Sequence, residues 1–429
     1  MDLDLGPAEM IVVGASLGTL RWFDDELPAG SVVVVEEPDV ISRRGIDRLV
    51  GRLSVLSRVV PAEYQTGFDA DALLAREPEL ATARLVVPGL EYAVGAAARL
   101  AARLGLPGAG ARAADVFSDK HRMRLLAADA GLPNPAYELV GTPQEAVAFA
   151  RRHGGRCVLK PTRRSGSLGV RLVADPAEIP AAWAATASPE APPEATDRGL
   201  PTQVLAEQVL DGREHSVELL VADGEVIFGN VTDKRVLPGP LPVETGHTVP
   251  SALPEATRRD LLDAAGRLCA AAGFRTGVLH SEWIVVGPRP GTGQAGAGGV
   301  PHLVECAARL PGDMITALIS VGYECGFIDA YLRVLRGERP TLPTRPTGAA
   351  AVEFLLAAPG TVTGIEGLRL ARRVPGVLEV QLDTAVGATV APVTSSGRRS
   401  GHVLAWGADP VEAERAARAA AAEIRVTVA

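Results

Sequence analysis

Lysine is nearly absent from this chain. Of its 43 basic side chains only three are lysines, Lys120, Lys160 and Lys234, and the others are arginines. A compact ammonium on a flexible stem and a planar guanidinium are not equivalent at a binding site. In a sequence this rich in Arg, Ala, Gly and Pro, the three lysines therefore mark positions where an ammonium is needed, unless they escaped the compositional bias by chance.

Cysteine and histidine are also scarce. The four cysteines lie apart, without a CxxC pair: Cys157, Cys269, Cys306 and Cys325. This distribution excludes a disulfide framework and predicts free thiols in a reducing cytoplasm. The seven histidines show no HxxxH or HExxH spacing, so a zinc site has little support.

Long apolar runs and basic clusters are missing as well. No stretch approaches the ~20 apolar residues that cross a bilayer, and the start, MDLDLGPAEM, lacks the basic and apolar regions of a secretory signal. The formal charge of −8, without a long basic run, disfavours nucleic-acid binding. We expect a cytoplasmic globular protein, and its 429 residues predict two to four packed units.

The most informative stretch runs from Cys157 to Val173 and reads CVLKPTRRSGSLGVRLV. Its two apolar runs predict strands, and Gly166 and Gly169 allow the intervening backbone to approach a ligand closely. Backbone amides with the Ser165 and Ser167 hydroxyls would then face an anion. A GxxxxGK[ST] phosphate loop opens a helix, whereas this loop returns to a strand. The alternative is an ordinary hairpin with a glycine bulge.

The first hundred residues alternate strands with helical stretches. Apolar runs at Met10–Val13, Ser31–Val35 and Ala83–Val87 predict a parallel sheet covered on both faces. The turn GASLGT after the first run is not GxGxxG, so a nicotinamide site is disfavoured. The strand ends, near Glu36 and Glu91, are a candidate site for a small ligand.

The middle of the chain mixes helices and strands. Asp119 caps a predicted helix that carries Lys120 in its first turn and ends before Gly131. Further helices are expected over 143–153 and 255–272, and a β meander over 204–231. The segment 236–250 (VLPGPLPVETGHTVP) is predicted to be a long loop over the substrate. Exposed loops are expected at 188–201, which is Pro-rich, and at 287–300, which is Gly-rich.

Two carboxylates fall on strands predicted to pair. His280 and Glu282 share one face of the run 278–286, and Glu305 lies on the return run 302–306. At ~4 Å and an effective dielectric near 20, two carboxylates repel by ~4 kcal/mol, so such a pair shares a proton or binds a cation. Oxygen ligands favour Mg²⁺, and Arg309 adds a fixed positive charge. Alternatively, the two glutamates point to different faces or pair with arginines.

The tail after residue 348 predicts an α+β unit. Strands are expected over 350–356, 377–382 and 402–406, and helices over 364–372 and from Pro410 onward. This unit could equally close a substrate cleft or support a homodimer.

Taken in order, these features resemble the ATP-grasp superfamily, and within it the L-amino-acid ligase-like carboxylate–amine ligases. The likeness covers most of the chain and is carried by DKHRMRLLAADAGLPNP from Asp119, VLKPTRRSGSLGV from Val158, EQVLDGREHSVE from Glu207 and ECAARLPGD from Glu305. PGTVTGIEGL from Pro359 and SGRRSGHVLAWG from Ser396 are similar to the C-terminal region of these ligases.

The resemblance implies a multidomain α/β and α+β fold of the ATP-grasp type. It would comprise a Rossmann-like parallel-sheet domain (1–115), a lid subdomain (116–206), a catalytic antiparallel-sheet domain (207–345) and a small C-terminal α+β extension (346–429).

The resemblance also implies roles for individual residues. Lys120 and Lys160 would hold the phosphates of ATP, with Lys234 as a further phosphate contact. The lid residues Ser165, Gly166, Ser167, Leu168 and Gly169 would fold over the γ-phosphate. Glu207, Gln208, Val209 and Leu210 would read adenine, and Glu214 the ribose. Glu282 and Glu305 would bind Mg²⁺, or Mn²⁺ in its place, and Arg309, with Lys160 and Glu305, would steady the transferring phosphoryl group. Ala307 stands where many members have Asn, which puts a second metal in doubt.

The implied reaction is ATP-dependent joining of an amino acid or related carboxylate to an amine through an acyl phosphate, giving ADP and a dipeptide or amide metabolite. Two alternatives stay open at this point. The acceptor could be ammonia or a carrier-protein thiol, or the chain could bind nucleotide without catalysis. Glu36, Glu91, His247 and Asp313 are candidates for substrate contacts.

Overall fold

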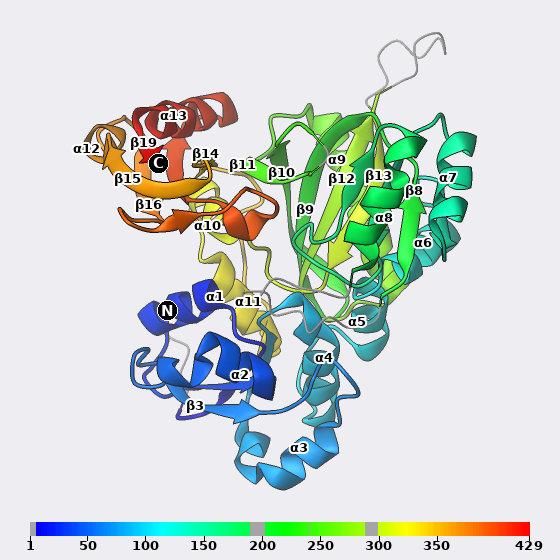
Figure 1. The fold of residues 1–429 in the computed structure, drawn as a ribbon. Helices are drawn as coiled ribbons and strands as arrows, with labels where there is room; N and C mark the ends of the chain where they lie inside the picture. The colour runs from blue at the N-terminus through cyan, green and yellow to red at the C-terminus, as the bar shows by residue number, and fades with distance from the viewer. Residues whose placement is uncertain (1–5, 189–201, 240, 288–298) are drawn as a thin grey trace.

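The computed structural model describes residues 6–188, 202–239, 241–287 and 299–429. The Pro-rich and Gly-rich loops expected at 188–201 and 287–300 lie largely outside these residues. Figure 1 shows the N-terminal unit below the middle of a large sheet, with the lid strands to one side and, on the other side, the C-terminal strands, some of which continue the same sheet. The domain boundaries suggested by the sequence stay predictions.

The N-terminal unit is built on a parallel sheet, as predicted, and this sheet has four strands. The strand order is β3 (Leu56–Pro61), β2 (Val32–Glu36), β1 (Met10–Val13), β4 (Leu85–Pro88). The helices of this unit are α1 (Leu17–Glu26), α2 (Pro38–Arg44), α3 (Ala70–Arg76) and α4 (Val94–Arg103). Met10 and Val12 pack into one core while Ile11 and Val13 pack into another, which is why β1 is apolar throughout. The strand β3 was not predicted, because its alternation of Ser, Arg and Val is weak.

The lid unit contains a second four-stranded sheet, in the order β5 (Tyr137–Val140), β8 (Val204–Glu207), β6 (Cys157–Pro161), β7 (Arg171–Val173). The helices α7 (Pro143–Arg152) and α8 (Ile179–Ala187) pack against this sheet. The helices α5 (Ala111–Phe117) and α6 (Lys120–Asp129) pack instead in the core of the larger central sheet. β6 and β7 pair antiparallel, so the predicted strand–loop–strand, the lid hairpin, is confirmed. The predicted meander is wrong at its first strand, because β8 pairs with β5 and β6 in this sheet.

The central sheet has eight strands in the order β13, β12, β9, β10, β11, β14, β18, β16. Their bounds are β13 (Val300–Ala307), β12 (Gly277–Val286), β9 (Gly212–Ala222), β10 (Glu225–Val236), β11 (Glu244–Val249), β14 (Ala349–Leu355), β18 (Gly401–Gly407) and β16 (Val377–Leu382). The helix α9 (Glu255–Ala272) packs on one face, and α10 (Ile315–Gly322) and α11 (Phe327–Leu335) pack on the other.

The predicted loop at 236–250 is wrong in its second half, which forms β11 in the middle of the central sheet. Through β11 the C-terminal strands β14, β18 and β16 continue the same sheet. Gly and Pro residues flanking ETGHTV concealed this strand in the sequence.

The chain ends in a small sheet and two helices. The sheet has the order β17 (Thr389–Val390), β15 (Gly360–Glu366), β19 (Arg425–Val428), and the helices are α12 (Leu368–Ala371) and α13 (Pro410–Glu423). The helix predicted over 364–372 is confirmed only at Leu368–Ala371, and its start is wrong because residues 364–366 belong to β15. Short 3₁₀ turns lie at Ile46–Leu49, Pro78–Thr82, Glu91–Ala93, Pro176–Glu178 and Ser396–Arg398.

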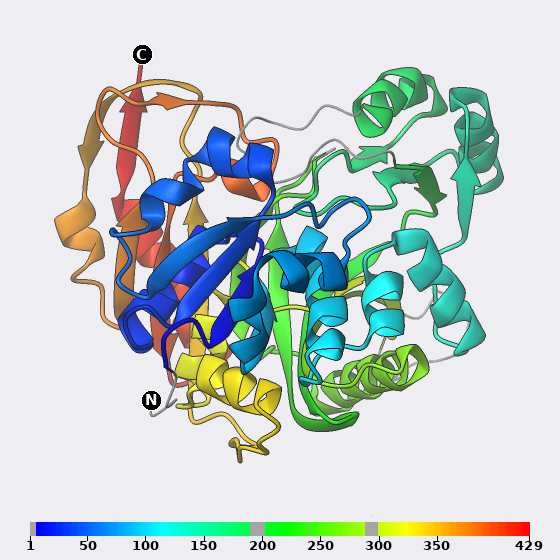
Figure 2. The same ribbon diagram turned by 90° about the horizontal axis from the view of Figure 1, so that it is seen from below.

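Figure 2 views the molecule from below, with the N-terminal sheet in front of the central sheet. Within the described residues, no single helix combines the length and apolar composition of a membrane span; only α10 and α11, bent by 108° from one another, reach that threshold as a pair.

Candidate active site

The hairpin of β12 and β13 brings the two predicted carboxylates together. Glu282 and Glu305 are direct partners across the antiparallel pair, so their side chains share one face. Their side chains are 15% and 34% exposed. The alternative that they point to different faces is excluded.

Each of these carboxylates contacts a lysine ammonium. Lys234 Nζ lies 2.6 Å from Glu282 Oε1, and Lys120 Nζ lies 3.0 Å from Glu305 Oε2. Lys234 also contacts Glu214 at 2.5 Å and Glu244 at 3.6 Å. Burial lowers the pKa of Lys234, but the surrounding carboxylates outweigh it and hold that pKa well above its usual value. The site therefore favours a positively charged group beside each of the two glutamates.

His280, two residues before Glu282 on the same face of β12, also contacts this cluster of carboxylates. Its Nδ1 lies 3.0 Å from Glu218 Oε1, and its Nε2 lies 3.5 Å from Glu282 Oε1. Burial lowers the pKa of His280, but these carboxylates prevail and raise it to about 9. An imidazolium at neutral pH thus contributes a further positive charge beside Glu282.

Lys160 is held by a different set of partners. Its Nζ lies 2.7 Å from Glu207 Oε2, and the buried Arg124 donates to both oxygens of the same carboxylate, at 2.7 and 3.2 Å. Burial lowers the pKa of Lys160 to about 8, against the opposing attraction of Glu207. Arg124 also donates to the carbonyls of Leu303 and Val304 on β13. This network ties the lid sheet to the central sheet.

Arg309 follows β13 and reaches the N-terminal unit. Its Nε donates to Glu91 Oε2 at 2.8 Å, and its Nη1 donates to the carbonyl of Leu310. Burial raises the pKa of Glu91, although Arg309 opposes the shift. One guanidinium therefore joins the end of the N-terminal sheet to the glutamate hairpin.

These groups line one cavity of about 360 Å³, which we call the main cavity. All three lysines of the chain line it, together with both glutamates of the hairpin and Arg309. Its wall also includes the predicted adenine and ribose contacts, Glu207, Gln208, Val209, Leu210 and Glu214. The structure thus brings together nearly all the residues selected from the sequence, whose roles stay predictions.

The five residues predicted to form the phosphate lid do not all line the same cavity. Gly166 and Ser167 line the main cavity, and Ser167 Oγ donates to the carbonyl of Pro242 at 3.1 Å. Ser165 lines a second cavity, whereas Leu168 and Gly169 are in the wall of neither. Ser167, Gly166 and Gly169 all have positive φ, at 59°, 64° and 78°, which suits a tight turn at the tip of the lid hairpin.

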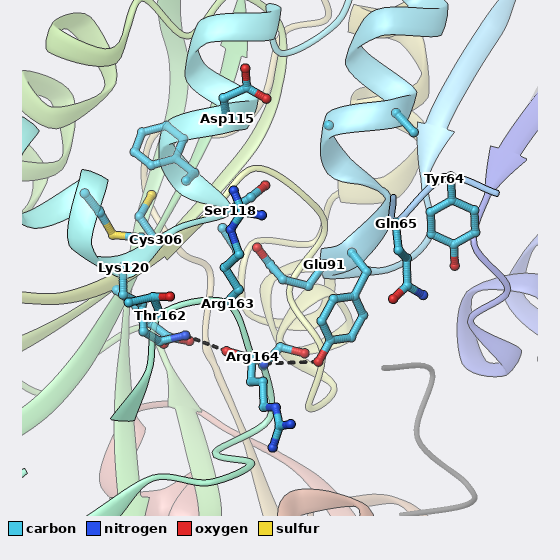
Figure 3. Close-up of a pocket in the computed structure, with 18 of the residues that line it drawn as sticks. Tyr64, Gln65, Glu91, Asp115, Ser118, Lys120, Thr162, Arg163, Arg164 and Cys306 are labelled. Atoms are coloured by element: carbon cyan, nitrogen blue, oxygen red, sulfur yellow. Dashed lines mark hydrogen bonds and ion pairs between the residues drawn. The ribbon is translucent and has the colours of Figure 1, made fainter. Parts of the chain in front are cut away.

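The second cavity, of about 320 Å³, opens on the other side of Lys120 and Glu305. Figure 3 shows Tyr64, Gln65 and Glu91 of the N-terminal unit on one side, and Arg163 and Arg164 of the lid hairpin on the other. Lys120 Nζ donates to the Arg164 carbonyl at 2.5 Å (Figure 3). Two compartments therefore meet at the Lys120–Glu305 ion pair.

Sequence reasoning missed Arg124 and Glu244. Arg124 lies one helical turn after Lys120, so the i,i+4 spacing on α6 could have revealed it. Glu244 was hidden in the segment taken for a loop.

Glu36, a candidate substrate contact, is fully buried and accepts hydrogen bonds from Ala15 N, Glu37 N and Tyr64 Oη, so it is a structural residue.

The facing glutamates also suit a divalent cation. Within the described ranges, no group of three or more His, Cys, Asp or Glu side chains could hold a metal. Mg²⁺ commonly takes one or two carboxylates and completes its shell with phosphate oxygens and water. Two acidic side chains, each now stabilised by an ammonium, match that requirement.

Two family models match parts of the chain. Residues 154–289 match the ATP-grasp domain, and residues 353–429 match the L-amino acid ligase C-terminal domain 2. The first covers the lid hairpin and Glu282, and the second covers most of the C-terminal strands.

Individual relatives share less than a third of their aligned residues with this chain. An uncharacterized protein of Sinorhizobium fredii is 28% identical, over 72% of this chain and 60% of that protein. The alanine–anticapsin ligase of Bacillus subtilis is 27% identical, over 56% of this chain and 51% of the enzyme. The chain thus spans only half to three fifths of these relatives. The crystal structure of an L-amino acid ligase from Bacillus licheniformis superposes with a TM-score of 0.75 at 20% identity, over 98% of both chains.

Proposed function

We propose that this chain, a member of the ATP-grasp superfamily with a C-terminal domain of the L-amino acid ligase type, is an ATP-dependent, ADP-forming carboxylate–amine ligase. One observation carries the proposal. The three lysines of the chain, two facing glutamates and Arg309 line a single cavity. Such a concentration of positive charge beside paired carboxylates suits a metal-bound triphosphate.

The residues divide the work of holding ATP. Glu207 to Leu210 would contact adenine, Glu214 the ribose, and Lys120, Lys160 and Lys234 the phosphates. Glu282 and Glu305 would hold Mg²⁺, which when bound neutralises charge on the phosphate oxygens. Lys120 and Lys234 now contact those glutamates, so phosphate binding would give both ammonium groups new partners.

The reaction proceeds in two displacements. A carboxylate oxygen of the first substrate attacks the γ-phosphorus, the bond to the bridging oxygen of ADP breaks, and an acyl phosphate forms. An uncharged amine then attacks the acyl carbon, phosphate leaves with the oxygen that attacked, and the nitrogen loses a proton. Positioning and charge neutralisation dominate such catalysis, and Arg309 and Lys160 supply both.

The proposed product is a dipeptide or a related amide. Purified protein would be incubated with ATP, Mg²⁺ and a panel of paired amino acids, with ammonia and a pantetheine thiol as further acceptors. We expect ADP release that requires both a carboxylate and an amine, with one amide formed per ADP. Turnover only with the thiol, or ATP binding without ADP release in any mixture, would contradict the proposal.

A further inference from the structure

The C-terminal segment between Ser396 and Ser400 reaches the wall of the main cavity. Arg399 follows the 3₁₀ turn Ser396–Arg398, and its side chain is only 12% exposed. Both of its terminal nitrogens donate to Asp313, with Nη1 3.0 Å from Oδ2. Its guanidinium also stacks on Phe354, with Cζ 3.6 Å from the ring centroid. The side chain is thus fixed by a two-pronged ion pair and an aromatic face.

Asp313 belongs to a turn with unusual backbone geometry. Asp313 and the following Met314 have φ values of 55° and 64°, a left-handed conformation that side chains with a Cβ rarely adopt. Asp313 lies four residues after Arg309 in the sequence, and Met314 is the N-cap residue of helix α10, which begins at Ile315. Consecutive left-handed residues persist only where the surroundings hold them.

Asp313 also connects the turn to β11. His247 Nε2 lies 3.2 Å from Asp313 Oδ2, and the imidazole packs edge-on against Phe354, with centroids 5.8 Å apart. The same C-terminal segment contacts Glu244 on β11, since Ser396 Oγ donates to Glu244 Oε2 at 2.7 Å. His247, Asp313, Glu244 and Ser396 all line the main cavity, whereas Arg399 does not.

We infer that Arg399 is a positioning residue for the ligase reaction: it holds the Asp313–Met314 turn in its left-handed conformation and, through Asp313, sets His247 and Arg309 for the substrate. The C-terminal unit is then an integral part of the active site rather than an appendage. Lysine could not replace Arg399, because an ammonium neither forms two parallel hydrogen bonds to Asp313 nor stacks on Phe354 in the same way.

The test compares Arg399→Ala and Arg399→Lys with Arg415→Ala, which removes the same charge from an arginine that is 77% exposed in the same unit. We expect both Arg399 variants to lower kcat by roughly tenfold or more, since small misplacements at a reacting centre are costly, while KM for ATP stays nearly unchanged. Millimolar methylguanidinium should restore part of the activity of Arg399→Ala but none of that of Arg399→Lys, whose side chain fills the site. A purely structural role predicts a loss of folded protein rather than a fall in kcat at constant KM for ATP.

Hydrogen exchange supplies a readout that does not require turnover. Amides of residues 312–318 and 244–249 should exchange faster in Arg399→Ala than in the wild type or Arg415→Ala, with those of the N-terminal sheet unchanged. The kinetic measurements rest on the proposed function. If the wild-type protein releases no ADP, that function is contradicted, and the hydrogen-exchange measurements alone decide the role of Arg399. Unchanged exchange, or faster exchange with normal kcat, overturns the inference.

Discussion

A buried ammonium is stable only when carboxylates compensate for its lost hydration, and each lysine of the main cavity has such partners. The carboxylate partners of the three lysines differ in whether metal and phosphate binding would involve them. Lys120 and Lys234 contact the glutamates proposed to hold the metal, whereas Lys160 contacts Glu207, which Arg124 also satisfies. Lys160 could therefore move to a phosphate without leaving Glu207 unpaired.

Replacing Lys160 with arginine should remove activity without unfolding the protein. The side chain is 5% exposed, and a planar guanidinium cannot occupy the place of the ammonium between Glu207 and β13 without displacing neighbours. We expect ADP release to fall by about 100-fold or more, with the circular dichroism spectrum unchanged. Arg156→Lys, the reverse exchange at a side chain that is 46% exposed, is the control and should leave turnover unchanged.

The low pKa of Lys160 predicts that ATP binding weakens with rising pH. Burial brings this pKa to about 8, so the ammonium is present below pH 8 and is lost as the pH rises through that value. If the phosphates require the charged form, ATP affinity should be about tenfold weaker at pH 9 than at pH 7. Equilibrium binding measured across this range tests the prediction. In Lys160→Arg the affinity should be weaker overall and should change less with pH than in the wild type, and a wild-type affinity that does not change with pH would exclude the phosphate contact.

The scarcity of lysine located the cavity from the sequence because each rare residue could be singled out. The same method could not find Arg124 or Arg399, since arginine is abundant and most of it lies on the surface. Nor could it show that the Glu36 carboxylate already accepts hydrogen bonds from backbone amides and from the Tyr64 hydroxyl. Apart from the i,i+4 spacing of Arg124 from Lys120, these assignments depend on contacts between residues far apart in the chain, which no local pattern records.

Among the elements, β11 joins the β9–β10 meander to the C-terminal strands. Gly246 lies in the middle of this strand, opposite Glu353 on β14. A methyl group there would come within 2.5 Å of the Val352 carbonyl oxygen, a backbone atom that cannot move aside. The absence of a side chain at this position is therefore a packing requirement of the sheet.

Gly246→Ala should destabilise the protein, and Gly266→Ala is its matched control. The first substitution forces β11 away from β14, at a cost of about 1–3 kcal/mol. The second lies in α9, where a methyl group meets no atom within 4 Å, and should stabilise the helix by about 0.5–1 kcal/mol. Thermal unfolding should give a lower midpoint for Gly246→Ala and a higher one for Gly266→Ala. Equal midpoints for the two variants would contradict this account of the strand.

Strong local patterns predicted elements well. α9 occurs at the predicted residues, and β1 does as well. Prediction failed where pairing rather than pattern decides the structure: β8 joins the lid sheet instead of the meander, and β11 forms although Pro and Gly flank it. The strands β15 and β19 escaped prediction: in the part of the chain that the structure describes, they form a small sheet of their own with the short β17.

At the scale of the whole molecule, the site is assembled from units that are distant in sequence. The lid sheet supplies Lys160, the central sheet supplies Lys234 and the glutamate hairpin, and the C-terminal unit supplies Ser396. The N-terminal unit reaches the same place through the Glu91–Arg309 ion pair. Family resemblance predicted the order of these units, but not which side chains would join them.

Glu91→Gln should weaken catalysis rather than nucleotide binding. Arg309 would lose a charged partner that is 16% exposed, while Glu91 itself does not line the main cavity. We expect kcat to fall by about tenfold with KM for ATP nearly constant. Glu79→Gln, at a carboxylate that is 78% exposed in the same unit, should behave as the wild type. A rise in KM for ATP with normal kcat would place Glu91 in nucleotide binding instead.

The transfer of oxygen from carboxylate to phosphate tests the central claim most directly. A first substrate labelled with ¹⁸O in its carboxylate would be incubated with ATP, Mg²⁺, an amine and the protein, and the phosphate released would be analysed by mass spectrometry. Attack on the γ-phosphorus predicts one ¹⁸O atom in each phosphate and one in each amide. Phosphate without ¹⁸O, formed together with ADP, would mean that water rather than the carboxylate attacks ATP, and would contradict the proposed ligase.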